Sequence, residues 1–234
     1  MRQILTINGK PLSDFGTYYD GAEWWQIPER DIETITVAGR SGDLIIDNNR
    51  FNNISIPFNC FIKTNFRGNY TALINYLMSL RGYQRVESNE QPDIYRMGIV
   101  HASIQPEMLA QNRKGTFEIE IDFKPQKWLK QGESVIDIET STSLYNPSQM
   151  ASKPLIMVTG TGTITINGEP MELTANTGKT FIDAETQDCY EGTINRNGDL
   201  ILSGEDIPSL TAGLNTITYT GFTAVQIIPR WWQL

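Results

Sequence analysis

Alternation of apolar and polar residues is the dominant pattern in the first half of the chain. Residues 116–123 alternate strictly, and residues 32–37 and 53–62 are similarly strand-like. A period of two is typical of β-strands that bury one face and expose the other. Pro57 interrupts one of these runs and favours an edge or a bulge, because proline donates no hydrogen bond to a neighbouring strand. These patterns predict a β-rich first half.

One segment follows the helical period instead. Residues 70–81 carry apolar side chains at the spacing of an amphipathic helix, with Asn69 suited to cap its start and Gly82 to end it. We expect this helix to pack on a sheet, and a helix offered to a partner's groove is the alternative. Its expected apolar side consists of Tyr70, Leu73, Ile74, Leu77 and Met78.

The pattern changes near residue 133, where short strands and frequent turns replace the longer runs. Turn signals recur at Asn167-Gly168, Asn197-Gly198 and Gly213, and no second long helix is apparent. Strands at this spacing predict a small β-sandwich. The expected strands are residues 154–159, 162–166, 171–174, 180–183, 189–195, 199–203, 214–220 and 224–230. We therefore expect two domains, 1–133 and 134–234.

The net charge of −8 is concentrated in the second domain. Residues 134–234 carry four basic and eleven acidic residues, whereas residues 1–133 are nearly balanced. An acidic chain without a basic patch argues against nucleic-acid binding by phosphate neutralisation. No apolar stretch is long enough for a signal peptide or a membrane span, so we expect synthesis in a cytoplasm and no membrane insertion. Cys60 and Cys189 are expected as buried free thiols.

Catalytic, cofactor and metal sites are not predicted. His101 is the single histidine, and we expect it to be structural, on a strand. The Gly160–Thr163 run lacks the third glycine and the helix of a phosphate loop. The acids near Asp183 and Glu205 are read as solvated turn residues. The sequence thus argues against an enzyme.

Two tryptophan pairs, Trp24-Trp25 and Trp231-Trp232, raise the alternative of sugar stacking. Neighbouring residues on a strand point to opposite faces. We expect one member of each pair to be buried and favour core or subunit contacts over a ligand.

Several motifs, in order, resemble the siphophage distal tail protein (Dit) family over essentially the whole chain. The first is Gly39-Arg40-Ser41-Gly42, similar to a turn that leads into a long hairpin in that family; Ala38 stands where proline is usual. The others are Asn146-Pro147 with Lys153-Pro154 and Gly160-Thr161-Gly162, then Ile182-Asp183-Ala184-Glu185 with Cys189-Tyr190, Gly204 and Ile207-Pro208, then Gly213-Leu214-Asn215 and Ile228-Pro229-Arg230-Trp231-Trp232.

The resemblance implies a structural virion protein with a mainly β, α+β fold. Residues 1–133 would form a ring-forming belt domain with one helix and a long hairpin, and residues 134–234 a galectin-like β-sandwich. The family forms a homohexamer at the phage tail tip, after synthesis in the host cytoplasm. The ring joins the tail tube protein to the tail-associated hub protein and can dock receptor-binding arms. DNA passes through its channel without specific binding.

A galectin-like carbohydrate-binding module is the alternative function. Galectins use a histidine among their sugar contacts, and residues 134–234 contain none. The second half also carries no large insertion that would add a carbohydrate-binding module. Both observations count against the lectin.

Two sets of residues are candidates for the ring. Residues 39–62 are expected as a hairpin that turns at Asp47-Asn48-Asn49, and its ring-interface candidates are Arg40, Gly42, Ile54 and Ile56, the last two being core residues in the alternative. Glu118, Glu120 and Asp122 share one strand face. That face is either a solvated outer surface or a channel lining that repels DNA phosphates.

Overall fold

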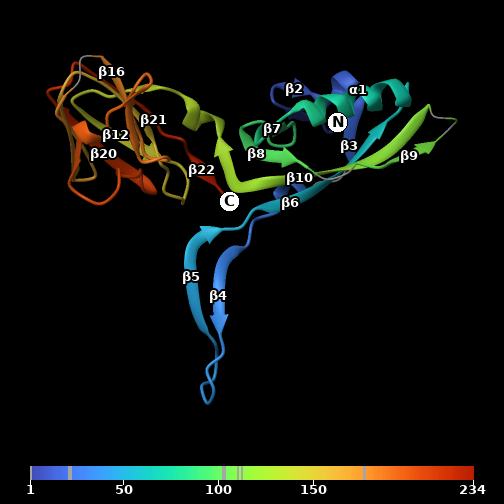
Figure 1. Cartoon of the computed structure of the whole chain (residues 1–234), viewed down its shortest axis with the longest axis horizontal. Helices are drawn as coiled ribbons and strands as arrows, with labels where there is room; N and C mark the ends of the chain where they lie inside the picture. Colours follow the sequence, from blue (N-terminus) through green and yellow to red (C-terminus); the bar gives the residue numbers. More distant parts are fainter. Residues whose placement is uncertain (1, 21–22, 102–103, 110, 112, 176–177) are drawn as a thin grey trace. The chain divides into compact units, whose positions relative to one another are not determined.

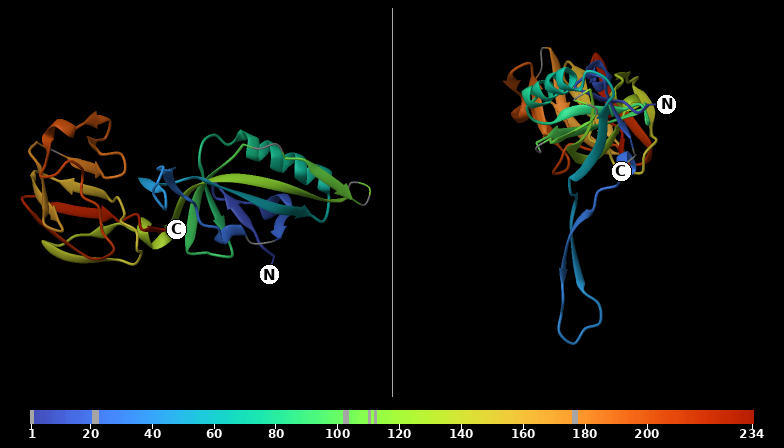
Figure 2. Two further views of the ribbon diagram at one scale, coloured as in Figure 1. Left: turned by 90° about the horizontal axis from the view of Figure 1, so that it is seen from below. Right: turned by 90° about the vertical axis from the view of Figure 1, so that its right-hand side faces the viewer.

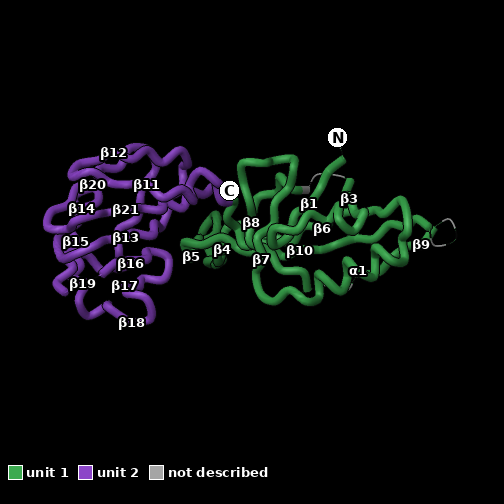
Figure 3. The backbone as a smooth tube through the Cα atoms, turned by 90° about the horizontal axis from the view of Figure 1, so that it is seen from above, with its two compact units in different colours: residues 1–127, 234 green, residues 128–233 purple. Residues whose placement is uncertain are grey.

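The computed structural model describes residues 2–20, 23–101, 104–109, 111, 113–175 and 178–234 (Figure 1). The chain divides into two compact units, unit 1 with Met1–Lys127 and Leu234, and unit 2 with Trp128–Gln233 (Figure 3). The structure confirms a mainly β, α+β fold, with one α-helix among the described residues. Each unit has its own core and is described separately.

Unit 1 is built on a twisted sheet whose strands follow the order β2-β1-β7-β8-β10-β6-β3, with β9 added to β10. The strands are β1 (Leu5–Ile7), β2 (Lys10–Pro11), β3 (Thr17–Asp20), β6 (Ile54–Ile62), β7 (Gln84–Ser88), β8 (Ile94–Val100), β9 (Pro106–Leu109) and β10 (Lys114–Leu129). Two further strands, β4 (Arg30–Ile35) and β5 (Leu44–Phe51), form a separate hairpin. The 3-10 helices η1 (Leu12–Phe15) and η2 (Glu23–Trp25) complete the unit.

The core of unit 1 lies on one face of this sheet, beneath α1 (Phe66–Ser79) (Figure 2). On β10, Phe117, Ile119, Ile121 and Phe123 are buried, while the intervening polar residues are exposed or half-buried. The alternation predicted for residues 116–123 is therefore confirmed. Pro57 faces the side of β6 that β3 leaves unpaired, since β3 reaches only to Asn59, which agrees with the expected edge position.

The helix begins four positions earlier than expected and ends at Ser79. Asn65, not Asn69, precedes its first turn, and Leu80 is already extended. The start is not visible in the sequence because Phe66 is held by tertiary packing: it is buried and lies against Phe117 of β10 at a ring distance of 6.3 Å. Leu73 and Leu77 are buried as predicted, but Met78 is 51% exposed, so the apolar side is narrower than the sequence indicated.

Unit 2 is a sandwich of two sheets. One sheet has the order β11-β21-β13-β16-β17-β18 and the other β12-β20-β14-β15-β19. Its strands are β11 (Ile136–Asp137), β12 (Ser141–Asn146), β13 (Leu155–Thr159), β14 (Gly162–Ile166), β15 (Glu169–Leu173), β16 (Lys179–Asp183), β17 (Asp188–Glu191), β18 (Ile194–Asn195), β19 (Leu200–Leu202), β20 (Gly213–Thr220) and β21 (Ala224–Ile228), with 3-10 helices η3 (Lys130–Glu133) and η4 (Asn197–Asp199). The short strand β22 (Trp232–Gln233) belongs to neither sandwich sheet and pairs with β10. Inward residues of both sheets form one core, for example Ile156 and Val158 against Ile164 and Ile217.

Of the three turn signals expected in unit 2, Asn167-Gly168 is an observed turn, whereas Asn197-Gly198 lies in η4 and Gly213 begins β20. Asn167 and Gly168 both have positive φ, 50° and 91°, and join β14 to β15 in a tight hairpin. The single strand expected over 189–195 is instead divided into β17 and β18 at Gly192, whose φ is 61°.

Buried cysteines and tryptophans agree with the sequence expectations. Cys60 and Cys189 are free thiols within the cores, and burial raises the pKa of Cys189 to about 11. Trp24 is fully buried whereas Trp25 is 58% exposed, although both lie in η2 and not on a strand. Trp231 is buried and Trp232 donates from Nε1 to the carbonyl of Ala151 at 2.9 Å. Each pair therefore has one core member.

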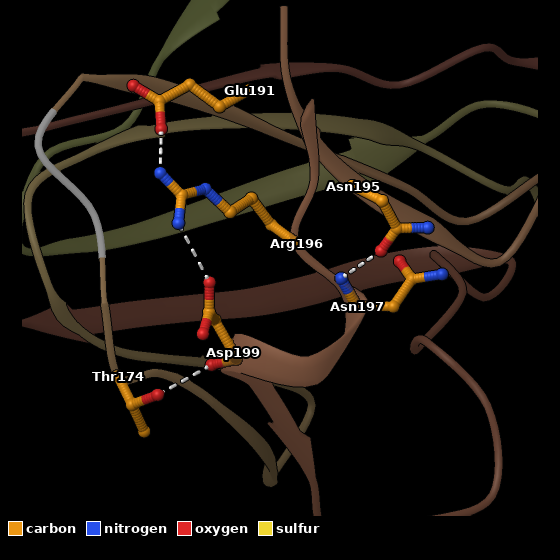
Figure 4. Close-up of polar contacts among 6 residues, drawn as sticks. All are labelled: Thr174, Glu191, Asn195, Arg196, Asn197 and Asp199. Atoms are coloured by element: carbon orange, nitrogen blue, oxygen red, sulfur yellow. Dashed lines mark hydrogen bonds and ion pairs between the residues drawn. The ribbon is translucent and has the colours of Figure 1, made fainter. Parts of the chain in front are cut away.

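A network of polar side chains closes the region around η4 (Figure 4). Arg196 donates to Glu191 at 2.8 Å and to Asp199 at 3.3 Å. Thr174, beyond β15, donates from its backbone N–H and its hydroxyl to the carbonyl of Asp199. The network joins β17 of one sheet to the end of β15 in the other, so its role is structural.

The end of unit 2 is fastened by an ion pair. Arg230 donates from Nη1 and Nη2 to the two carboxylate oxygens of Asp183 at 2.6 and 3.0 Å. Burial alone would raise the pKa of Asp183, but the hydrogen bonds from Arg230 outweigh it and hold that pKa below its ordinary value of 3.8. A carboxylate with a lowered folded pKa stabilises the fold above the unfolded pKa, and the contribution is lost as pH falls through the folded pKa.

We predict that Arg230→Met destabilises unit 2 by about 3 kcal/mol, because it leaves the carboxylate of Asp183 buried without its partner. The loss should be present at neutral pH and shrink below pH 3.8. Denaturant unfolding as a function of pH measures both. Asp137→Asn, which removes an exposed carboxylate of the same unit, is the control. Equal stability of Arg230→Met and the control at neutral pH would contradict the prediction.

Candidate functional site

The described residues contain no cluster of three or more His, Cys, Asp or Glu residues suited to holding a metal ion. His101 lies just after β8 with an exposed side chain, and not on the strand as expected. Its neighbours 102 and 103 lie outside the described residues. Among the described helices, none is long and apolar enough to cross a membrane. The candidate sites are therefore surfaces.

The most distinctive surface is a hairpin, residues 30–51, here called the arm, that projects from the sheet of unit 1 (Figures 1 and 2). Its strands are β4 and β5, and its turn spans residues 36–43. The expected turn at Asp47-Asn48-Asn49 is wrong, because these residues lie within β5. The chain reverses instead around Gly39 and Gly42, whose φ values of 79° and 84° suit glycine.

The arm exposes apolar side chains on both of its faces. Cross-strand partners share a face, so Ile35 and Leu44 lie on one side and Thr34 and Ile45 on the other. The exposed fraction of the six large apolar side chains ranges from 41% to 61%, the set being Ile32, Ile35, Val37, Leu44, Ile45 and Ile46. A two-stranded ribbon that buries neither face is marginal in water, so the arm needs a partner surface.

A polar elbow lies at the base of the arm. The register shifts between Arg30 and Ile32, opposite a segment of β5 in which Asn49 has a φ of 54°. Asp47 accepts from the backbone N–H of Asn49 at 2.8 Å and pairs with Arg30 at 3.3 Å. Arg50 pairs with Asp31 at 2.8 Å. These contacts explain why the Asp-Asn-Asn run resembles a turn in sequence while forming a bulge within a strand.

Both roots of the arm are anchored to unit 1. Arg96 is fully buried and donates from Nη2 to the carbonyls of Trp24 and Gln26 at 3.0 and 2.9 Å, ahead of β4. Burial lowers the pKa of Arg96 to about 10. On the other root, Asn53 donates to Tyr83 at 2.7 Å and to Asp122 at 3.1 Å. Nothing in the sequence marks Arg96 for this role, because the pattern around an arginine in an alternating strand does not distinguish a buried side chain from a solvated one.

The second surface is the acidic face of β10. Glu118, Glu120 and Asp122 lie opposite Asn59, Pro57 and Ser55 of β6. Ser55 donates to Glu120 at 2.7 Å. No ion pair involves these three carboxylates among the described residues. They share one face, as the sequence predicted.

The structure separates the four ring-interface candidates. Arg40 and Gly42 lie in the exposed turn of the arm. Ile54 is half-buried at the start of β6, whereas Ile56 is fully buried in the core of unit 1. The side chain of Ile56 is therefore unavailable to a neighbour, because it points to the same face of the sheet as Ile119 and Ile121. The sequence-based analysis missed the apolar residues of β5, Leu44 to Ile46, as exposed contact candidates.

Comparison with solved structures finds the same arrangement elsewhere. The crystal structure of the Dit (gp 19.1) protein of phage SPP1, described as a paradigm of the hub adsorption apparatus in phages that infect Gram-positive bacteria, superposes with a TM-score of 0.79 over 100% of both chains at 13% identity. The chain has the distal tail protein fold. Two structures of the phage P2 baseplate in its activated conformation, with Ca and with Sr, also match. Their TM-scores are 0.55 and 0.52 at 9% and 8% identity, over 97% of this chain and 97% and 96% of theirs.

Neither a protein-family model nor a curated protein matches the sequence. This chain and the SPP1 Dit protein thus share a fold over the full length of both chains, although only 13% of their residues are identical.

We predict that the elbow depends on the left-handed conformation of Asn49. Asn49→Val should weaken the arm by about 1–2 kcal/mol, since β-branched residues are strained at positive φ, while Asn49→Gly should be tolerated. Amide hydrogen exchange across β5 measures local opening of the arm. Faster exchange in the valine variant than in the glycine variant is expected, and equal exchange rates would refute the role of the elbow.

Proposed function

We propose that this protein is a structural component of a phage tail, a distal tail protein that forms a homohexameric ring at the tail tip. The observation that carries the proposal is the arm: a ribbon with exposed apolar residues on both faces, on a fold shared over its full length with the SPP1 Dit protein. Such a ribbon is a liability in a monomer and a pairing surface in an assembly. No catalytic role is proposed.

In this proposal the ring joins the tail tube protein to the hub protein, and receptor-binding arms dock around it. Unit 1 forms the belt of the ring, with Arg40 and Gly42 at the subunit interface. Unit 2, a galectin-like sandwich, lies outside that interface. The location is the tail tip of the virion, after synthesis in the host cytoplasm.

The acidic face of β10 is proposed to line the channel. Glu118, Glu120 and Asp122 would then present a ring of carboxylates to passing DNA. Like charges repel over a Debye length of about 8 Å at physiological ionic strength, so the phosphates would slide past without adhering. A basic lining would bind DNA by releasing its counterions.

The ring is tested with the purified protein. Negative-stain images and sedimentation should show a six-membered ring. Ile35→Asp combined with Leu44→Asp should abolish the ring without unfolding unit 1, because both side chains are exposed. Ile56→Asp is the contrasting variant and should unfold unit 1, because it buries a charge in the core. A wild-type protein that stays monomeric at every concentration and with tail partners would refute the ring.

The carbohydrate-binding alternative predicts a different result. We expect no saturable heat when the full chain is titrated with lactose, because residues 134–234 lack a histidine and Trp231 is buried. The half-buried Trp232 is the side chain left to stack on a sugar. Saturable binding that disappears in Trp232→Ala would establish the lectin instead.

A further inference from the structure

The end of unit 1 opposite the arm is basic. Four cationic residues lie there with exposed side chains, and the described residues offer them no ion pair: Lys63, Arg67, Arg113 and Lys114. Glu107 is the single carboxylate in residues 62–68 and 104–115. In a chain with a net charge of −8, this concentration of positive charge is exceptional.

The four cations come from elements that meet at one place. Gly115 lies opposite Ile62 of β6 and opposite Met108 of β9, so Lys114 and Lys63 lie beside each other at the strand ends. The backbone N–H of Phe66, at the start of α1, donates to the carbonyl of Arg113 at 3.3 Å. This set of elements is here called the basic end, and it lies at the right of unit 1 in Figure 1.

The basic end also exposes apolar side chains. Met108 and Leu109 of β9 are 55% and 47% exposed. β9 pairs with β10 on one side, and no other strand pairs with it among the described residues. Exposed apolar residues on an open strand edge, rimmed by charges, are typical of a protein-binding surface. A nucleic acid would use the cations but leave the two apolar side chains uncovered.

The arm has the complementary chemistry. Ile35, Leu44 and Ile46 share one face with Glu33. Glu33 and Asp43 are the two arm carboxylates that are in no ion pair, since Asp31 and Asp47 are held by Arg50 and Arg30. Asp43 accepts one hydrogen bond, from Thr36 at 3.0 Å. Arg40 and Asp43 both lie beyond the strands, in the turn at the tip of the arm, so Glu33 is the free carboxylate on the apolar face itself.

The arm cannot reach the basic end of its own chain. The arm leads into Ile54, the first residue of β6, and the basic end begins just after Ile62, the last residue of this nine-residue strand. At about 3.3 Å per residue these positions are about 30 Å apart. The arm also points away from the sheet (Figure 2). The two surfaces can therefore meet only between copies.

We propose that the arm of one copy docks on the basic end of the next, with Ile35, Leu44 and Ile46 against Met108 and Leu109, and with Glu33 and Asp43 near the four cations. The contact is head-to-tail, so it repeats from copy to copy and closes into a ring. The inference rests on the proposed ring and names the two surfaces that hold it together.

Charge reversal tests the contact. One variant combines Glu33→Lys with Asp43→Lys, and the other combines Arg113→Glu with Lys114→Glu. Sedimentation velocity should show that each variant alone needs on the order of tenfold more protein to assemble than wild type, because like charges now face each other. An equimolar mixture should assemble again with alternating copies, since each reversed surface then meets a surface of opposite charge.

The matched control combines Arg81→Glu with Lys10→Glu, which lowers the net charge by four, as the Arg113→Glu and Lys114→Glu variant does, at exposed positions outside the arm and the basic end. It should assemble like wild type, and circular dichroism should be unchanged in all variants. Suppose wild type forms rings. If the charge-reversal variants then assemble like wild type, or if their equimolar mixture does not assemble, the proposed contact is wrong and the proposed ring is unaffected. If wild type never assembles, the ring falls and the contact with it.

Discussion

A two-stranded ribbon in water has two unprotected faces and two unpaired edges, and this constraint governs the surface of unit 1. The arm satisfies its internal hydrogen bonds and ion pairs at the elbow, yet its apolar residues gain nothing from solvent. Its roots are held by buried donors such as Arg96, so the ribbon leaves the sheet at a defined place. The anchored root and the exposed apolar side chains of the arm together favour a role in which another molecule covers those side chains.

The two units respond differently to the same chemistry. Unit 2 pairs some of its charged groups internally, as in the Asp183 and Arg230 pair and in the network around Arg196, although residues 134–234 carry eleven acidic and four basic residues. Unit 1 carries charged side chains without ion pairs at its ends, namely cations near Lys114 and carboxylates on the arm. Surface charges worth little in a single chain gain value when an interface excludes water from them. The unpaired charged side chains at the ends of unit 1 are therefore available to a partner, whereas the paired side chains named in unit 2 hold that unit together.

Local patterns predicted much of the fold, and their failures have physical causes. Alternation identified the core side of β10, and Asn167-Gly168 marked a hairpin, because both depend on neighbours in sequence. The helix start at Phe66 depends on contacts with distant residues, so Asn69 was mistaken for the cap. The arm turn was misplaced because Asn49 adopts a left-handed conformation inside a strand. The basic end could not be predicted from local sequence patterns, because its four cations come together only when β6, α1 and β10 meet.

The pairing of β6 with β10 also has a consequence for synthesis. Ile62 meets Gly115, and Ile54 meets Phe123, so the register joins segments far apart in the chain. On the ribosome, β6 emerges well before β10, and the side chain of Ile56 has its cross-strand partner Ile121 only once β10 follows. Non-local pairing of this kind slows folding and leaves strand edges prone to aggregation. The nascent chain therefore passes through an interval in which apolar residues of its future core are exposed and prone to aggregation. A chaperone that shields residues 54–62 would act at that stage.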